Sequence, residues 1–157
     1  MPDKPEMTID ESKTYRVTVD SSKGPFVMDL QPSLAPKTVN NFVHLANQGY
    51  YDGLTFHRYV PEFVIQGGDP TGTGGGGPGY KFEDEPVKAS YREGAVAMAN
   101  SGPNTNGSQF FITNTDCQNK LAPSYNLFGF VVQGQDVVNS LRQGDVMNKV
   151  SVEEREG

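Results

Sequence analysis

An arginine and a glutamine stand within a largely apolar stretch, residues 56–69, which reads Phe-His-Arg-Tyr-Val-Pro-Glu-Phe-Val-Ile-Gln-Gly-Gly-Asp. Strand alternation would place Arg58 on the same face as Phe56 and Val60. A charge on an apolar face is costly unless it is paired, lies at the surface or has a function. Taken alone, Arg58 is most simply a structural arginine, with its stem on an apolar wall and its charge in solvent or paired. A functional arginine requires further residues beside it.

The segment 109–113, Gln-Phe-Phe-Ile-Thr, is the candidate for that second group of residues. Strand alternation places Gln109 and Phe111 on one face of it. Phe110 and Ile112 then point to the other face. Two large apolar faces on one strand predict a core on one side and a pocket on the other.

A glycine-rich run at residues 71–79 could be mistaken for a nucleotide-binding loop, since Gly72, Gly74 and Gly77 satisfy G-x-G-x-x-G. A dinucleotide fingerprint opens a helix directly after a strand, whereas Pro78 follows here and no amphipathic helix begins. No Lys-Ser/Thr pair closes the run, so it is not a P-loop either. We expect a flexible surface loop.

Composition excludes several other kinds of function. Two histidines and one cysteine show no ligand spacing, so we expect no metal. The net charge of −6 without a basic block argues against nucleic acid or an anionic membrane as partner. No apolar run approaches the ~20 residues that span a bilayer, and no signal peptide is visible. Because Cys117 alone cannot form an internal disulfide, a reducing, cytoplasmic setting fits best.

A chain of 157 residues is most simply one domain. We expect a flexible tail over residues 1–13, a folded domain over 14–153 and a short tail over 154–157. Hydrophobic alternation predicts strands, and 3.6-residue periodicity predicts two helices. Beside the stretch 56–69, strands are expected over 15–19, 26–30, 94–100, 109–113, 127–132 and 146–152, and helices over 37–48 and from 134 to 144. Many strands with two separated helices favour a closed antiparallel barrel with helical caps, because closure removes exposed edges.

Two long motifs resemble those of the cyclophilin family of peptidyl-prolyl cis-trans isomerases. The first joins residues 56–58 to 66–69, and the second is Met-Ala-Asn-Ser-Gly-Pro-Asn-Thr-Asn-Gly-Ser-Gln-Phe-Phe-Ile over 98–112. The resemblance spans residues 15–152. It implies a closed eight-stranded antiparallel β-barrel capped by two α-helices, with the active face outside the barrel. It also implies catalysis of rotation about X–Pro bonds in unfolded or flexible segments, assisting protein folding without a cofactor.

The same resemblance implies a role for each matching residue. Arg58 would be the catalytic guanidinium and Gln66 the carboxamide that supports it. The pocket for the proline ring would be formed by Phe63, Val64, Phe111 and Leu121, capped by Tyr125. Residues that hold the peptide backbone would be Ala99, Asn100 and Gln109, and those beside a neighbouring pocket would be Gly72 and Thr73. His57 is expected to be structural, as a buried imidazole bonded to backbone, and Cys117 to be a quiet loop thiol.

Two positions depart from the family pattern. Lys120 stands where the family usually has a tryptophan whose indole bonds cyclosporin-type ligands, so weakened affinity for these ligands is expected. Tyr125 stands where many members carry histidine, which predicts a change in substrate preference. A module that binds proline-containing peptides without catalysis is the alternative function, and a degenerate member of this kind would be expected to lose Arg58 first. We expect a monomer.

Overall fold

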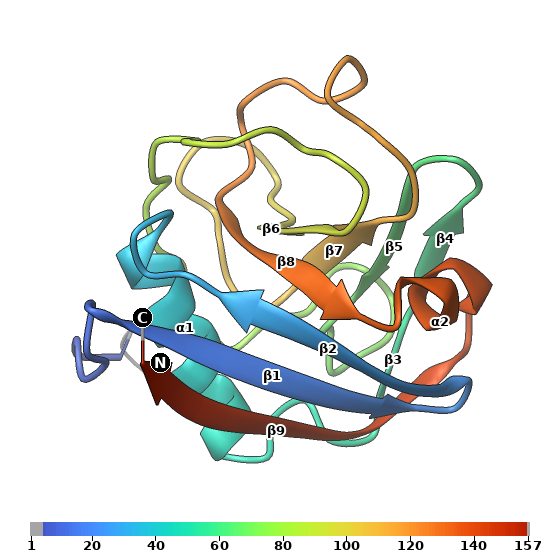
Figure 1. Cartoon of the computed structure of the whole chain (residues 1–157), viewed down its shortest axis with the longest axis horizontal. Helices are drawn as coiled ribbons and strands as arrows, with labels where there is room; N and C mark the ends of the chain where they lie inside the picture. The colour runs from blue at the N-terminus through green and yellow to red at the C-terminus, as the bar shows by residue number, and fades with distance from the viewer. Residues whose placement is uncertain (1–4, 157) are drawn as a thin grey trace.

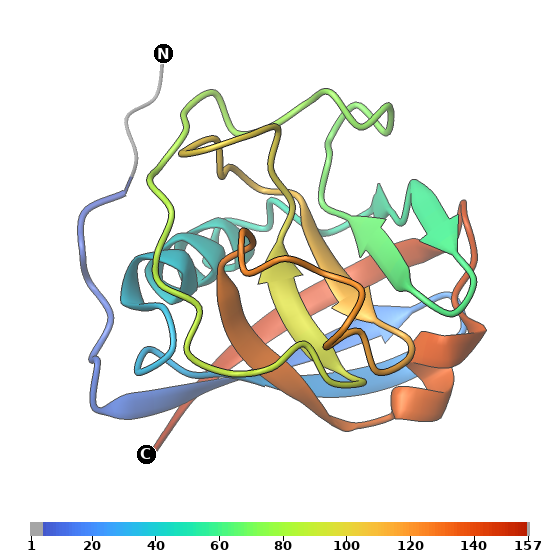
Figure 2. The ribbon, with the colours of Figure 1, turned by 90° about the horizontal axis from the view of Figure 1, so that it is seen from above.

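The computed structural model describes residues 5–156. Residues 1–4 of the expected N-terminal tail and Gly157 of the expected C-terminal tail lie outside the described residues. The strands are β1 (Lys13–Ser21), β2 (Gly24–Leu30), β3 (Leu54–Thr55), β4 (Arg58–Val60), β5 (Val64–Gly67), β6 (Ala95–Met98), β7 (Phe110–Thr113), β8 (Leu127–Gln133) and β9 (Val146–Glu156). The helices are α1 (Pro36–Asn47) and α2 (Gln135–Ser140), which lie at opposite ends of the curled sheet (Figures 1 and 2).

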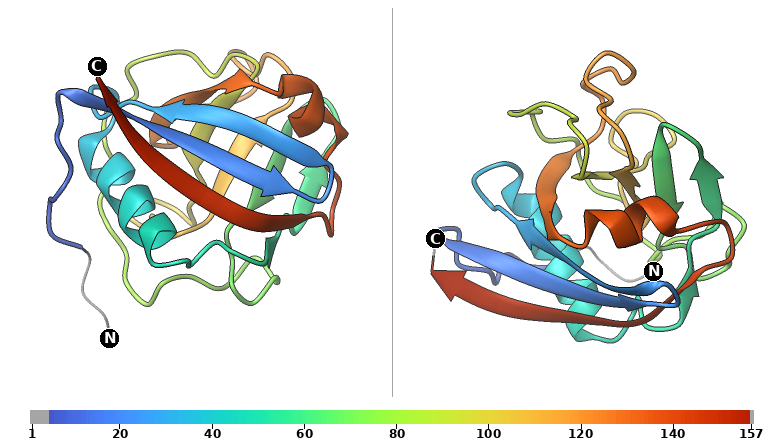
Figure 3. Two further views of the ribbon diagram at one scale, coloured as in Figure 1. Left: turned by 60° about the horizontal axis from the view of Figure 1, so that its bottom comes forward. Right: turned by 45° about the vertical axis from the view of Figure 1, so that its right-hand side comes forward.

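All nine strands belong to one antiparallel sheet in the order β3-β9-β1-β2-β8-β6-β7-β5-β4. The sheet curls around its own core, with β1, β2 and β9 forming one wall (Figure 3). The expected mainly β fold with two helices is therefore present. The expected closed barrel of eight strands is not seen. The sheet has nine strands, and within residues 5–156 no ladder joins its two terminal strands, β3 and β4. These two strands follow each other directly in the chain and pair with different partners, β9 and β5.

The hairpin of β1 and β2 shows how alternation sets the register. Val17 pairs with Met28 and Val19 with Phe26, and all four side chains are buried. Their alternate neighbours face outward, because successive side chains on a strand point to opposite faces. Gly24 closes the turn with a φ of +117°, a conformation that favours glycine.

Helix α1 packs its apolar stripe into the core. Phe42 stacks on Tyr51 at 4.7 Å between ring centroids and meets Phe110 edge-on at 5.4 Å. The first free amides of the helix, those of Lys37 and Thr38, donate to the Glu85 carboxylate at 3.0 and 2.7 Å. A carboxylate at a helix N-terminus satisfies unpaired donors and complements the helix dipole. The helix expected over 37–48 is confirmed within one residue.

The chain does not keep strand alternation through residues 54–60. Phe56 is fully buried while Arg58 is exposed, so the two do not share a face as expected. The backbone of Phe56 leaves the ladder to exchange hydrogen bonds with Asp145 and Gly144, at 2.8 and 2.9 Å. This break splits the stretch into β3 and β4. Arg58 therefore points away from the core.

The tails also differ from the expected boundaries. β9 pairs with β1 as far as Glu156, so residues 154–156 belong to the sheet. At the other end, the amides of Thr8 and Ile9 donate to Asn40 of α1 at 3.0 and 3.3 Å, so this part of the expected tail is attached to the domain.

The second helix ends at Ser140, before Gly144. Within residues 5–156, no helix is long and apolar enough to cross a bilayer.

Candidate active site

Three polar side chains, two from neighbouring strands and one from the residue just before a third, form a row on the outer face of the sheet. Arg58 of β4 lies opposite Gln66 of β5 in register, and its Nη1 donates to Gln66 Oε1 at 3.3 Å. Gln66 Nε2 in turn donates to Gln109 Oε1 at 3.2 Å. The strand pairing brings together residues that are up to 51 positions apart, numbers 58 and 109 of the sequence. Arg58 itself is exposed, so its charge is available to a ligand.

An apolar cluster adjoins this row and is separate from the main core. Val64 and Phe111 are 2% and 4% exposed, and Tyr125 meets Phe111 edge-on at 5.5 Å. Partly buried side chains packed against the cluster include Phe63, Ala99 and Leu121. Phe110 and Ile112 belong instead to the main core. The assignment of Phe111 to one face and of Phe110 and Ile112 to the other is therefore confirmed, whereas a pocket beside Phe111 stays a prediction.

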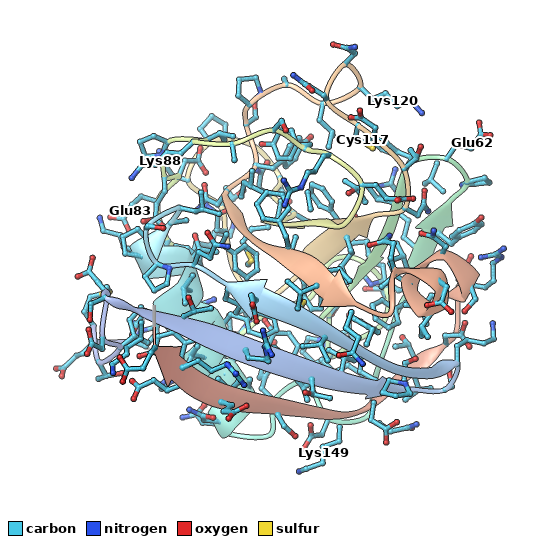
Figure 4. All side chains as sticks on the ribbon, viewed as in Figure 1. Glu62, Glu83, Lys88, Cys117, Lys120 and Lys149 are labelled. Atoms are coloured by element: carbon cyan, nitrogen blue, oxygen red, sulfur yellow. The ribbon has the colours of Figure 1, made fainter. Side chains whose placement is uncertain are left out.

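A loop is tied to the turn that carries Phe63. The Phe63 carbonyl accepts hydrogen bonds from the Asn114 amide at 3.0 Å and from Cys117 Sγ at 3.4 Å. Lys120 Nζ reaches the carbonyl of Glu62 at 2.8 Å, from the loop that Figure 4 shows beside this turn. Burial raises the pKa of the Cys117 thiol. A raised pKa disfavours the thiolate, which agrees with the expected quiet thiol.

Tyr91 fixes the position of Tyr125. Its hydroxyl donates to the Tyr125 carbonyl at 2.6 Å and accepts from the Tyr125 amide at 3.2 Å. Burial raises the pKa of Tyr91 to about 12, so the phenol stays protonated and can make both bonds. The sequence offered no signal for this role, because the contact joins residues 34 positions apart.

The glycine-rich run folds around the carboxylate of Asp69, which is 1% exposed. Asp69 Oδ1 accepts from the amide and hydroxyl of Thr71, both at 2.8 Å. Asp69 Oδ2 accepts from the amides of Thr73, Gly74 and Gly76 at 3.1, 2.6 and 3.1 Å. Burial raises the pKa of this carboxyl, but the hydrogen bonds outweigh it and hold the pKa well below its usual range. The loop expected to be flexible thus has a defined conformation, which the sequence did not indicate.

His57 packs beside this loop. A Cβ atom on Gly74 would lie 3.6 Å from His57 Nε2. The backbone hydrogen bond expected for this imidazole is absent, since the buried Nδ1 has no partner within the described chain. Burial lowers the pKa of His57, which favours the neutral ring. A structural role for His57 stays a prediction.

A cavity of about 720 Å³ opens between the glycine-rich loop and the segment around residues 99–109. Gln66, Ala99, Asn100 and Gln109 line it, whereas Gly72 and Thr73 precede the loop residues that do. The Asn100 amide is already engaged, because Nδ2 donates to the Ser124 carbonyl at 2.8 Å and Oδ1 accepts from the Gly102 amide at 3.1 Å.

Comparison with known proteins identifies the family. A sequence profile described as "Cyclophilin type peptidyl-prolyl cis-trans isomerase/CLD" matches residues 14–155. The chain belongs to the cyclophilin-type peptidyl-prolyl cis-trans isomerases. The peptidyl-prolyl cis-trans isomerase activity expected from the two motifs is the activity of this family, so that prediction is confirmed.

Individual relatives match this cyclophilin over most of their own length. Peptidyl-prolyl cis-trans isomerase B of Bacillus subtilis is 48% identical over 141 residues, covering 88% of this chain and 96% of the relative. Peptidyl-prolyl cis-trans isomerase CYP18-2 of Arabidopsis thaliana is 47% identical over 136 residues, covering 83% and 82%. The crystal structure of a cyclophilin-type isomerase of Cryptosporidium parvum superposes with a TM-score of 0.82 at 33% identity, covering 89% and 98%.

Alanine substitutions at two neighbouring glycines, Gly76 and Gly77, test the placement of the loop around Asp69. A Cβ on Gly76 would overlap Asp69 Oδ1, whereas one on Gly77 meets nothing within 4 Å. We expect Gly76→Ala to lower the free energy of unfolding by about 1–3 kcal/mol through overpacking. Gly77→Ala should change it by less than about 0.5 kcal/mol. Urea unfolding of the two variants checks this, and equal midpoints would contradict the placement.

Proposed function

We propose that this cyclophilin catalyses rotation about X–Pro bonds in unfolded or flexible segments with Arg58 as the catalytic group. The observation that carries the proposal is the exposed Arg58 guanidinium held by Gln66 beside the apolar cluster of Val64 and Phe111. The cluster receives the proline ring, and the guanidinium lies where it can reach the bond that rotates.

The chemistry requires this combination of groups. Rotation faces a barrier of ~18–20 kcal/mol, because resonance ties the prolyl nitrogen lone pair to the carbonyl. As the bond twists, the lone pair localises on nitrogen, and a donor aimed at it binds more strongly than in the planar state. This difference is transition-state stabilisation. Arginine suits the role because it stays charged and its fork can meet both nitrogen and oxygen. No bond is made or broken, so neither a nucleophile nor a covalent intermediate takes part.

The remaining site residues hold the substrate. Phe63 and Leu121 complete the walls around the proline ring, and Tyr125 caps it from the position that Tyr91 fixes. The peptide backbone before the proline lies along Ala99, Asn100 and Gln109, and its side chains extend over the cavity towards the loop that contains Gly72 and Thr73. A structure of the Cryptosporidium parvum enzyme was obtained in the presence of the dipeptide Ala-Pro. That ligand class matches the proposed substrate.

A short peptide containing Ala-Pro tests the proposal directly. Exchange between its cis and trans forms takes tens to hundreds of seconds without catalyst. We expect substoichiometric protein to accelerate this exchange in NMR spectra, and Arg58→Ala to abolish most of the acceleration. A module that only binds peptides would shift peak positions without accelerating exchange, which would refute the catalytic role.

Lys120 sets an expected response to cyclosporin-type ligands. We expect weak inhibition of the wild-type protein, with isomerase activity retained, because no indole stands at this position. Lys120→Trp should lower the inhibitor concentration needed by roughly ten-fold, since one well-placed hydrogen bond with stacking contributes about 1–2 kcal/mol. Lys120→Ala serves as the control and should show no such gain. Ordinary tight inhibition of the wild type would refute this assignment.

The setting of the protein is proposed on more general grounds. A cytoplasmic location is supported by the single cysteine, Cys117, which is buried. A monomeric state is supported by the small number of exposed large apolar side chains among the described residues, Met7 and Val132. Gel filtration with light scattering tests the second point.

A further inference from the structure

The glycine-rich loop is joined to Arg58 by an unbroken path of hydrogen bonds. Gln109 Nε2 donates to the carbonyls of Gly74 and Gly76, both at 2.9 Å. These are two of the three residues whose amides donate to Asp69 Oδ2. From Gln109 the path continues through Gln66 to Arg58, as described for the row on the sheet. One buried carboxylate thus organises the acceptors that hold the far end of the row.

The hydrogen bonds of the Gln109 carboxamide connect the loop to the sheet. Gln109 immediately precedes β7, and its carboxamide bridges the sheet to the loop. Its Nε2 is held by the loop, which leaves its Oε1 turned towards Gln66. The loop carbonyls of Gly74 and Gly76 provide that hold. Gln66 then presents Oε1 to Arg58 because its own Nε2 is occupied by Gln109.

We infer that Asp69 is a positioning residue for catalysis, acting through the glycine-rich loop and Gln109 on the Gln66–Arg58 pair. The inference rests on the proposed role of Arg58. It assigns the loop a function inside the active site in place of nucleotide binding or a free surface loop. Because Asp69 is 1% exposed, its effect on the rate would come through the positions of other groups.

Asp69→Asn is the sharpest test, because it preserves shape while removing acceptors. In either orientation the amide turns one oxygen into a donor, which leaves two or three of the groups donating to Asp69 unpaired. The loop then loses its centre, and the carbonyls of Gly74 and Gly76 shift away from Gln109. We expect kcat/KM for an Ala-Pro peptide to fall about three- to five-fold, since small misplacements of catalytic groups are costly. The side-chain amide signals of Gln109 should also move in NMR spectra.

Asp145→Asn is the matched control for loss of stability. Its carboxylate likewise accepts a backbone amide, that of Arg142 at 2.7 Å, together with Ser22 Oγ at 2.8 Å and Lys23 Nζ at 3.0 Å. None of these partners belongs to the path described above. Both variants should lose stability, but only Asp69→Asn should lose activity. Gly76→Ala replaces Asp69→Asn if the latter does not fold, because it displaces the same loop.

A double-mutant cycle with Gln109→Ala separates positioning from a general structural effect. Gln109→Ala lowers activity by itself, and Asp69→Asn should add less than a further 1.5-fold in that background. Full additivity, or a loss of activity no larger than that of Asp145→Asn, would overturn the inference. Arg58→Ala is measured in parallel. If it is inactive while Asp69→Asn equals Asp145→Asn, only the inference fails; if it is fully active, the proposed function fails.

Discussion

Replacing Arg58 by alanine is expected to reduce kcat/KM for proline isomerisation by roughly 10²–10³-fold, the range found when one preorganised transition-state donor is removed. The guanidinium is exposed, and among residues 5–156 its one hydrogen bond is to Gln66 at 3.3 Å. The fold therefore does not depend on it, and the free energy of unfolding should change by less than about 0.5 kcal/mol. NMR exchange spectroscopy on an Ala-Pro peptide, with thermal unfolding alongside, measures both quantities.

Two further arginine variants define the cause of the loss. Arg58→Lys keeps the charge but not the planar fork, so an intermediate rate is expected. Arg16→Ala removes an arginine of β1 that pairs with Asp29 at 2.8 Å, and it should leave the rate unchanged. A rate for Arg58→Ala equal to that of Arg16→Ala would remove Arg58 from the mechanism.

Phe111→Ala is expected to lower kcat/KM by roughly 10- to 100-fold. The ring belongs with Val64 to the apolar cluster beside Arg58, and Tyr125 meets it edge-on. A proline ring that no longer meets this wall loses about 1.5–3 kcal/mol of apolar contact, which corresponds to the stated range of rates. The effect should appear with every proline-containing peptide, because it concerns the ring itself.

The neighbouring Phe110 is the matched control for this change. Phe110 lies on the other face of β7, in the main core, and is fully buried. Phe110→Ala should destabilise the protein by about 3–5 kcal/mol while the folded fraction keeps its activity. Phe110→Leu replaces it if too little protein folds. Because Phe111 is also buried, both changes should destabilise the protein, but isomerisation rates corrected for the folded fraction by chemical denaturation should fall only for Phe111→Ala. An equal loss of activity at both positions would contradict the separation of core from pocket.

Much of the site could be predicted because its elements are locally encoded. The alternation in 109–113 assigned Gln109 and Phe111 to one face and Phe110 to the other, and the structure confirms it. The periodicity over residues 37–48 likewise predicted α1 within one residue. These predictions succeed because the side-chain periods of strand and helix are fixed by backbone geometry.

Other features could not be predicted because long-range contacts determine them. Alternation across residues 54–60 fails where the backbone of Phe56 bonds to Gly144 and Asp145, far along the chain. Sheet closure depends on which strands pair, and the two ends of this sheet take different partners. Pairing of distant segments leaves no local pattern in the sequence, so neither result was visible in advance.

The stretch 56–69 shows most clearly which features are encoded locally and which depend on long-range contacts. The sequence by itself determined that Arg58 and Gln66 belong with a second strand bearing Gln109 and Phe111, because the two motifs resemble one family. Only the tertiary structure decided that Arg58 faces outward and that Asp69, at the end of the same stretch, gathers four residues of the glycine-rich loop around its carboxylate. The physical reason is that residue types set which interactions are available, whereas burial and hydrogen-bond direction depend on where the rest of the chain lies.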